Sequence, residues 1–504
     1  MKSKNQKCKI PNILLFFTDQ QRGDTIHELG NAYIQTPNMD RLCQEGAAFE
    51  RAYSPSPVCV PGRCSTYYGR YPFKTGCYDN CDPMPGNLPS MMQVLSNNGY
   101  RTHGIGKMHF TPYLHELRGF ISRERQEELP GSVEEDEYLK YLWNKGYRHI
   151  FDPHGQRSEM YYIPQISQLP AKDHPTQWVG DKTTEFLREH DGSRPFFLMS
   201  SFIHPHPPFS PPTPWNKLYR AKDMPHANVP ENYKECITYA NRFQNRYKYR
   251  DQGIDKNLVR TQKAFYYSCI SFIDYQIGRI LSVLENMGEL DNTLIILTSD
   301  HGEMLGDYNC FGKRTMLDAA ARVPMLARFP GRIPAGIRIG EPVSLVDVMP
   351  TVLDTAGIKN MPEGLDGESL YDVAEGKLTD RYVYSQFQNG SLGLYMIASR
   401  NYKYIYSTPD DKEYFFDNSK DENETMNLSS NYEYKDIFSQ MKRRLISVLG
   451  KCKDGISVRD NDWIRYDRMD IPLDPDEYLL FQDNCFANDL ESQISSGYSI
   501  KLFS

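Results

Sequence analysis

The sequence has no apolar run of the roughly 18 residues that a membrane-spanning helix requires. Its first apolar run, Ile13–Phe17, is too short for the core of a signal peptide, and no small-residue cleavage site follows it. No membrane span is therefore expected. The chain as given is expected to be cytoplasmic, or periplasmic or secreted if a leader has been removed.

The sequence also lacks an excess of positive charge. It has 58 Lys and Arg residues against 65 Asp and Glu residues, a formal net charge of −7. A protein that binds nucleic acid through bulk charge needs the opposite balance, so no nucleic-acid partner is expected. An anionic substrate would have to be bound by a local cluster of cations.

A disulfide framework is not indicated. The 11 cysteines are scattered through 504 residues, and their odd number leaves at least one unpaired within the chain. Cys77 and Cys81 have no second pair with which to bind a metal, so ordinary thiols are favoured. This usage suits a reducing compartment.

Apolar segments alternate with helical patterns over the first three quarters of the chain. Four segments read as buried strands and are followed directly by polar residues; they are 12–18, 102–105, 195–203 and 293–298. Such alternation predicts an α/β fold with a mainly parallel central sheet flanked by helices. In open α/β sheets ligands bind beyond the carboxyl ends of the strands, so the four polar ends are expected to converge.

The pattern changes after about residue 375. Short, aromatic-rich segments between 382 and 416 are separated by turn residues and predict antiparallel strands, and a helix is expected near 434–449. We therefore predict a catalytic domain over 1–375. Residues 376–504 would form a smaller α+β subdomain with a short antiparallel sheet, followed by a tail.

The segment most suggestive of chemistry is Cys59-Val60-Pro61-Gly62-Arg63. Pro61 can open a helix at its first turn. A nucleophile just before Pro61 would face the free N–H groups of that helix, which attract anions. Arg63 would lie about one turn along and could hydrogen-bond the same group.

Cys-x-Pro-x-Arg followed by Gly-Arg-Tyr-Pro resembles the signature of the type I sulfatases, in the alkaline-phosphatase-like superfamily. Further segments fall in the order and spacing typical of that family; they are 12–19, 36–43, 106–109, 205–207, 300–302 and 312–313. The resemblance spans roughly residues 10–360, and segments near Lys403 and Asp417 look like the family's C-terminal subdomain. An alkaline-phosphatase-like fold is therefore expected.

The resemblance implies a specific chemistry. A formylglycine-generating maturase would oxidise Cys59 to formylglycine (3-oxoalanine), whose hydrated form attacks the sulfur of a sulfate ester. Asp19, Gln20, Asp300 and His301 would hold a divalent metal together with residue 59. The other catalytic residues would be Lys107 and Lys313, which bind sulfate oxygens, His109, which assists the hydrated aldehyde, His206, which protonates the leaving oxygen, and Arg63.

Two residues depart from the usual family pattern. Gln20 replaces an aspartate and removes one negative charge from the metal ligands. Hard oxygen ligands favour calcium, with manganese or magnesium as alternatives. The pairing of Asp-Gln with Asp-His also occurs in related phosphonate monoester and phosphodiester hydrolases. Gly62 stands where Ser or Ala is usual, which leaves open which maturase recognises the site.

The leading hypothesis is a sulfatase acting on a small-molecule or saccharide sulfate ester, with a sulfated sugar favoured over aryl and choline sulfates. A phosphonate monoester or phosphodiester hydrolase is one alternative, and a catalytically silent protein that binds sulfated glycans is another. The segment 106–109 argues for sulfate, because two donor groups suit a tetraoxo anion. Lys313 is preferred to Arg314, and His206 to His204.

Overall fold

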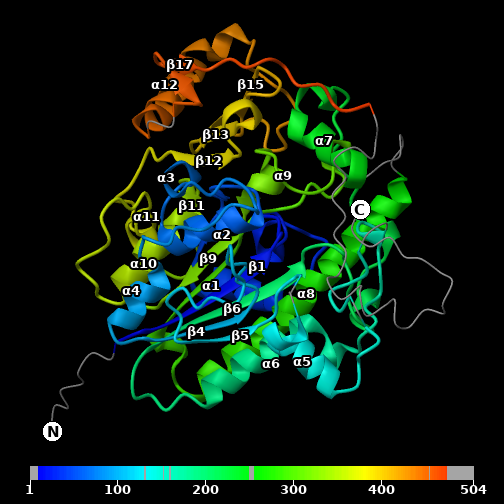
Figure 1. Cartoon of the computed structure of the whole chain (residues 1–504), viewed down its shortest axis with the longest axis vertical. Helices are drawn as coiled ribbons and strands as arrows, with labels where there is room; N and C mark the ends of the chain where they lie inside the picture. The colour runs from blue at the N-terminus through cyan, green and yellow to red at the C-terminus, as the bar shows by residue number, and fades with distance from the viewer. Residues whose placement is uncertain are drawn as a thin grey trace.

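The computed structural model describes residues 10–129, 132–150, 152–157, 160–248, 255–452 and 455–473. Within these residues, eight strands form a large central sheet with helices on both faces, and a smaller sheet lies to one side (Figure 1). In spatial order, the strands of the large sheet are β10 (Ile337–Ile339), β2 (Ala47–Phe49), β9 (Met325–Arg328), β7 (Thr293–Ser299), β1 (Asn12–Asp19), β6 (Phe196–Pro205), β4 (Arg101–Gly106) and β5 (Ser122–Arg125). The predicted α/β fold is confirmed.

Parallel strands make up the part of the sheet that carries the polar strand ends. Strand β1 pairs in parallel with β6 and β7, and β4 pairs in parallel with β6 and β5. Strand β9 runs antiparallel to β7 and β2, so the sheet as a whole is mixed. Strands β1, β6 and β7 are buried along their whole length, which explains their largely apolar sequences. Their carboxyl ends meet at one edge, as expected.

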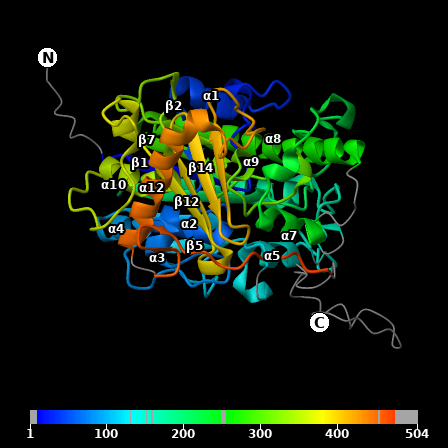
Figure 2. The same cartoon turned by 90° about the horizontal axis from the view of Figure 1, so that it is seen from above.

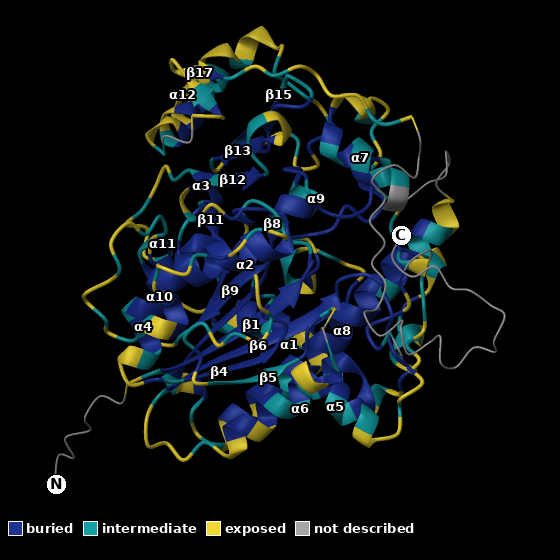
Figure 3. Cartoon of the chain, in the orientation of Figure 1, coloured by how far each residue is buried: buried dark blue, intermediate teal, exposed yellow. Residues whose placement is uncertain are grey.

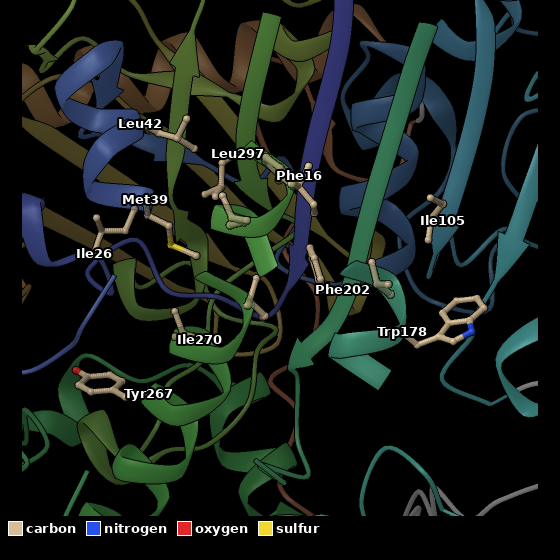
Figure 4. Packing of buried hydrophobic residues seen from close by; sticks show 14 of the residues in the cluster. Phe16, Ile26, Met39, Leu42, Ile105, Trp178, Phe202, Tyr267, Ile270 and Leu297 are labelled. Carbon is tan, nitrogen blue, oxygen red and sulfur yellow. The ribbon is translucent and has the colours of Figure 1, made fainter. Parts of the chain in front are cut away.

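The side chains of β1 alternate between two hydrophobic cores. Leu14 and Phe16 pack into one core, and Ile13, Leu15 and Phe17 pack into the other. Figure 4 shows Phe16 beside residues of neighbouring strands and helices in the first core. That core contains residues of α1 (Pro37–Glu45), α5 (Glu137–Asn144), α6 (Pro175–Arg188) and α8 (Lys256–Asn286); the second contains residues of α2 (Cys59–Tyr68), α4 (Met91–Asn97), α10 (Val348–Thr355) and α11 (Leu370–Ala374).

Exposure is concentrated on the outer surfaces of these helices and on the loops (Figure 3). The remaining short elements near the site are α3 (Pro72–Thr75), α7 (Tyr239–Lys248), α9 (Asp318–Ala321) and a small sheet of β11 (Val343–Ser344), β3 (Ala52–Tyr53) and β8 (Arg322–Val323). No helix in the described ranges is both long enough and apolar enough to cross a membrane. The nine cysteines within those ranges are all free thiols, Cys77 and Cys81 among them.

The C-terminal strands form an antiparallel meander. The strands are β12 (Val383–Phe387), β13 (Leu394–Ala398), β14 (Tyr402–Ser407) and β15 (Lys412–Asp417), close to the predicted segments. Figure 2 shows α12 (Lys435–Lys451) lying across this sheet, and the hairpin β16 (Val458–Arg459) and β17 (Asp462–Trp463) follows it. The division at residue 375 stays a prediction, and residues 474–504 of the predicted tail lie outside the described residues.

Candidate active site

Four side chains with metal-binding atoms converge at the carboxyl edge of the large sheet. Asp19 ends β1, Asp300 and His301 follow β7, and Cys59 begins α2. Their ligand atoms all lie within 4.8 Å of one another, and none of the four side chains is exposed. The structure thus brings together four of the five predicted metal ligands as possible donors.

The fifth predicted ligand, Gln20, lies directly beside this cluster. Its backbone has φ 68°, a left-handed conformation that is uncommon outside glycine. Its N–H donates to Oδ1 of Asp300 at 3.0 Å, and its side-chain Oε1 accepts from Nζ of Lys313 at 3.2 Å. The amide Nε2 donates to the carboxylate of Glu303. The turn after β1 therefore places the Gln20 side chain between the cluster and Glu303.

Helix α2 begins at Cys59 itself, so Pro61 lies within its first turn, as predicted. Because Val58 is extended, residue 59 occupies the first helical position and Pro61 follows within the first turn. The Sγ atom of Cys59 lies 3.3 Å from Nε2 of His301 and 2.7 Å from Nζ of Lys313. Burial would raise the pKa of the Cys59 thiol, but Lys107 and Lys313 hold it well below its usual value.

Arg63 contacts the two carboxylates of the cluster. Its Nε donates to Oδ2 of Asp300 at 2.9 Å, and its Nη2 donates to Oδ2 of Asp19 at 3.2 Å. Its Nη1 donates to the carbonyl oxygen of Lys107 at 2.6 Å and to Oγ of Ser201 at 3.0 Å. The expected hydrogen bond was to the anion at position 59. In the structure, all three guanidinium nitrogens donate to groups on β1 and β6 or to the residues that directly follow β4 and β7.

Two glycines permit the close approach of backbone segments at this edge. A Cβ atom on Gly62 would lie 3.0 Å from the carbonyl oxygens of both Asp300 and Ser56. Gly106 has φ 88°, and a Cβ there would lie 1.9 Å from the carbonyl oxygen of Ser201. The glycine at position 62, unusual for the resembled family, therefore fits a tight contact between α2 and the segment after β7.

Lys107 and Lys313 reach the site from two segments that are far apart in the sequence. Nζ of Lys107 lies 2.7 Å from Oδ2 of Asp19, 2.6 Å from Oε2 of Glu128 and 4.0 Å from Sγ of Cys59. Burial would lower the pKa of Lys107, but Asp19 and Glu128 raise it well above its usual value. Arg314 lies 3.8 Å from Asp79 rather than at Cys59, so the structure places Lys313 in the site as predicted.

The three histidines considered for the site, His109, His204 and His206, differ in the groups that their rings contact. His109 has φ 53°, its ring contacts Cys59, and its buried Nδ1 has no hydrogen-bond partner in the part of the chain that is described. His206 also contacts Cys59, and its Nδ1 lies 2.7 Å from the carbonyl oxygen of Pro207. His204 instead contacts Oγ of Ser210 at 3.2 Å, and burial lowers its pKa to about 3. A neutral, buried His204 fits the predicted role of a structural neighbour.

Sequence reasoning missed two carboxylates beside the site. Glu128 lies 2.8 Å from Nη1 of Arg157 and 3.5 Å from Nδ1 of His206, as well as next to Lys107. Burial would raise the pKa of Glu128, but these cations hold it well below its usual value. The segment around Glu128 has no regular pattern, so no sequence signal identified it. Glu303 was detectable, because it follows Asp300-His301-Gly302 directly.

The donor set fits a divalent cation. Asp19 and Asp300 supply carboxylate oxygens, and Nδ1 of His301 donates to the carbonyl oxygen of Gly302 at 2.9 Å, which leaves Nε2 as an acceptor. A cation would also offset the buried negative charge of the two carboxylates, which Arg63 and Lys107 balance in part. Such a cluster, with Cys59 at the start of α2 and at the carboxyl edge of this sheet, is the arrangement expected of an alkaline-phosphatase-like hydrolase.

Comparison with known proteins agrees with this class. The sequence model of the sulfatase family matches residues 11–358, and the model described as N-sulphoglucosamine sulphohydrolase, C-terminal, matches residues 306–451. An arylsulfatase of Clostridium perfringens is 32% identical over 468 residues, covering 88% of this chain and 95% of that protein. A choline-sulfatase of Rhizobium meliloti is 29% identical over 442 residues, covering 84% of this chain and 83% of that protein.

Among solved structures, the phosphonate monoester hydrolase of Agrobacterium radiobacter superposes with a TM-score of 0.77 at 26% identity, covering 90% of this chain and 99% of that one. The sulfatase family model spans more than half of the chain. The chain therefore belongs to the sulfatase family and is a sulfuric ester hydrolase, as the sequence motifs predicted.

Proposed function

We propose that this chain hydrolyses its sulfate ester with residue 59 as the nucleophile, after oxidation of Cys59 to formylglycine by a maturase. The supporting observation is that four polar side chains beside the metal-donor cluster lie close to the side chain of residue 59. They are Lys107, Lys313, His109 and His206. A hydrated formylglycine would supply a hydroxyl group where the thiol now lies.

Asp19, Gln20, Asp300 and His301 would hold a divalent cation, with calcium favoured by the oxygen donors and manganese or magnesium as alternatives. When bound, the cation would lower the pKa of the attacking hydroxyl and neutralise charge on the sulfate. Arg63 would keep the two carboxylates in place, because it donates a hydrogen bond to each of them.

The remaining polar side chains would divide the work on the substrate. Lys107 and Lys313 would bind sulfate oxygens, since their ammonium groups lie 4.0 Å and 2.7 Å from Sγ of Cys59. His109 would assist the nucleophile, and His206 would protonate the leaving oxygen. Glu128 faces His206 and Lys107: its charge helps to raise the pKa of Lys107, and it offsets part of the lowering that burial imposes on the pKa of His206.

A sulfated saccharide is the substrate class that we favour. The match of residues 306–451 to the C-terminal model of an N-sulphoglucosamine sulphohydrolase supports it, because that region includes the small antiparallel sheet. The aryl- and choline-sulfatase relatives keep aryl and choline sulfates as alternatives. In this proposal, residues 1–375 carry the chemistry, and the subdomain that begins at 376 would help to enclose the saccharide.

Hydrolysis of a phosphonate monoester or phosphodiester is the second candidate, favoured by the Asp19-Gln20 and Asp300-His301 donor set and by the likeness to the hydrolase of Agrobacterium radiobacter. Kinetics on an aryl sulfate and an aryl phosphonate with the same leaving group would decide between them. We expect the larger kcat/KM on the sulfate. A much larger kcat/KM on the phosphonate would overturn the proposed preference.

A further inference from the structure

Glu303 is a buried carboxylate that receives four hydrogen bonds from uncharged donors. Its Oε2 accepts from Nε2 of Gln20 and from the hydroxyl of Tyr162 at 3.1 Å. Its Oε1 accepts from the backbone N–H of Leu305 at 3.0 Å and from that of Gly312. In the described part of the chain, no lysine or arginine forms an ion pair with this carboxylate. A fully buried anion without such a partner is costly unless nearby positive charge offsets it.

The carboxylate determines the orientation of the Gln20 amide. A side-chain amide has an acceptor oxygen and a donor nitrogen of nearly equal size, so its shape alone does not select one orientation. An ionised carboxylate only accepts, so it requires Nε2 of Gln20 to point toward Glu303. Oε1 then faces Nζ of Lys313, which itself lies 2.7 Å from Sγ of Cys59.

The same carboxylate also holds the segment that carries Lys313. Gly312, whose N–H bonds Oε1, immediately precedes Lys313 in the chain. The carbonyl oxygen of Lys313 accepts a second bond, from Nε2 of Gln244. Glu303 thus connects a candidate metal ligand and a candidate sulfate-binding lysine through one side chain with no exposed surface.

We propose that Glu303 is a positioning residue that orients the side-chain oxygen of Gln20 toward the metal. Through its hydrogen bond to the Gln20 amide, Glu303 also supplies the negative charge that a glutamine ligand lacks and an aspartate ligand would carry. Outer carboxylates that orient a ligand and increase its basicity commonly alter metal affinity when they are removed. The inference rests on the proposed role of Gln20 as a metal ligand.

The test exchanges the amide and the carboxylate across their hydrogen bond. Glu303→Gln removes the charge and lets the Gln20 amide turn. The double variant Gln20→Glu with Glu303→Gln again has one carboxylate and one amide in the pair, but the carboxylate is now at position 20, next to the metal. Tyr162→Phe is the matched control, because it removes one bond to Oε2 but leaves the bonds to Gln20 and Gly312.

Calcium and manganese dissociation constants would be measured by calorimetric titration of chelator-treated protein, whose folding is checked by circular dichroism. We expect Glu303→Gln to weaken binding by about 10–100-fold. The exchange variant should recover most of that loss, and Tyr162→Phe should bind nearly as the unsubstituted protein does.

Unchanged affinity in folded Glu303→Gln would overturn the inference. If Glu303→Gln does not fold, the exchange variant decides: a folded protein that binds metal supports the inference, and failure to recover folding or binding contradicts it. The titration needs no substrate, so the result does not depend on whether the ester is a sulfate or a phosphonate. Absence of metal binding by the unsubstituted protein would overturn both the proposed metal site and the role of Glu303.

Discussion

The Nε atom of Arg63 lies 2.9 Å from Oδ2 of Asp300, and neither side chain has any exposed surface. Asp300 stands next to a second buried carboxylate, Asp19, and burial together with that neighbour raises the pKa of Asp300. The guanidinium bonds both carboxylates and so offsets part of their charge. In the structure, Arg63 therefore holds the two carboxylates together.

Replacement of Arg63 by methionine should be strongly destabilising, because it leaves two buried carboxylates without their shared cation. Breaking a buried pair in this way costs about 3–5 kcal/mol. Urea unfolding in the presence of chelator would measure the change. Arg41→Gln is the matched control, since Arg41 pairs with Glu45 and Glu285 at the surface and should cost at most about 1 kcal/mol. Equal losses for the two variants would contradict the role given to Arg63.

The adjacent cations Lys313 and Arg314 allow the effect of losing each one on catalysis to be compared. Lys313→Ala should lower kcat/KM for a sulfate ester by about 10²–10³-fold, the effect typical of losing one donor to transition-state charge. Arg314→Ala should change it little, because the Arg314 guanidinium lies beside Asp79, which is not among the metal-donor residues. Steady-state kinetics on both variants would check this. Similar losses at the two positions would argue against direct contact of Lys313 with the sulfate.

The effect of replacing His206 on kcat/KM should depend on the acidity of the leaving alcohol. His206→Gln is expected to lower kcat/KM by about 10²–10⁴-fold for esters of poorly acidic alcohols, since general-acid catalysis contributes about that much. The loss should shrink for an aryl sulfate whose phenol leaves without protonation. A Brønsted plot against leaving-group pKa would measure the difference. A loss that is the same for every ester would contradict the general-acid role.

Stability should fall in acid partly through His103, which lies in β4 away from the metal donors. Its ring stacks on Phe186 with centroids 4.8 Å apart, and its Nδ1 lies 2.7 Å from Oγ of Ser122. Burial, with a contribution from Arg101, lowers the pKa of His103 from 6.5 to about 4. The unfolded chain therefore binds this proton more readily, so stability is present above pH 6.5 and is lost as pH falls toward 4.

The linked loss for His103 is about 3 kcal/mol. Unfolding free energies of the unsubstituted protein and of His103→Gln, measured between pH 7 and pH 4, would check it. The unsubstituted protein should lose more stability than the variant over this range. Parallel curves would show that protonation of His103 is not coupled to unfolding.

Much of the fold could be predicted from the sequence, because buried parallel strands leave continuous apolar runs. The ends of β1, β4, β6 and β7 were expected to converge, and they do. Antiparallel β9 was not anticipated, since Met325–Arg328 is too short to reveal its direction from pattern alone. The helix that carries Pro61 in its first turn was also predicted, because proline is tolerated where a helical N–H has no intrahelical partner.

The candidate site was predictable where residues follow strands in recognisable motifs, as at Asp19, Lys107 and Asp300. It was less predictable where function depends on a side chain's partners. Arg63 follows Cys59 by four residues, but which carboxylates it bonds depends on strands distant in sequence. Glu128 lies in an irregular segment, and only the folded chain brings it to Lys107 and His206.

The central claim is that residue 59 is the nucleophile in its oxidised form. Mass measurement of the peptide containing position 59, in active protein from its native host, tests this claim most directly. The account predicts the mass of an aldehyde side chain in place of a thiol, with Cys64 unmodified in the same peptide. Fully active protein with an unmodified Cys59 would contradict it, and an unmodified, inactive protein would favour the reading of a silent binding protein.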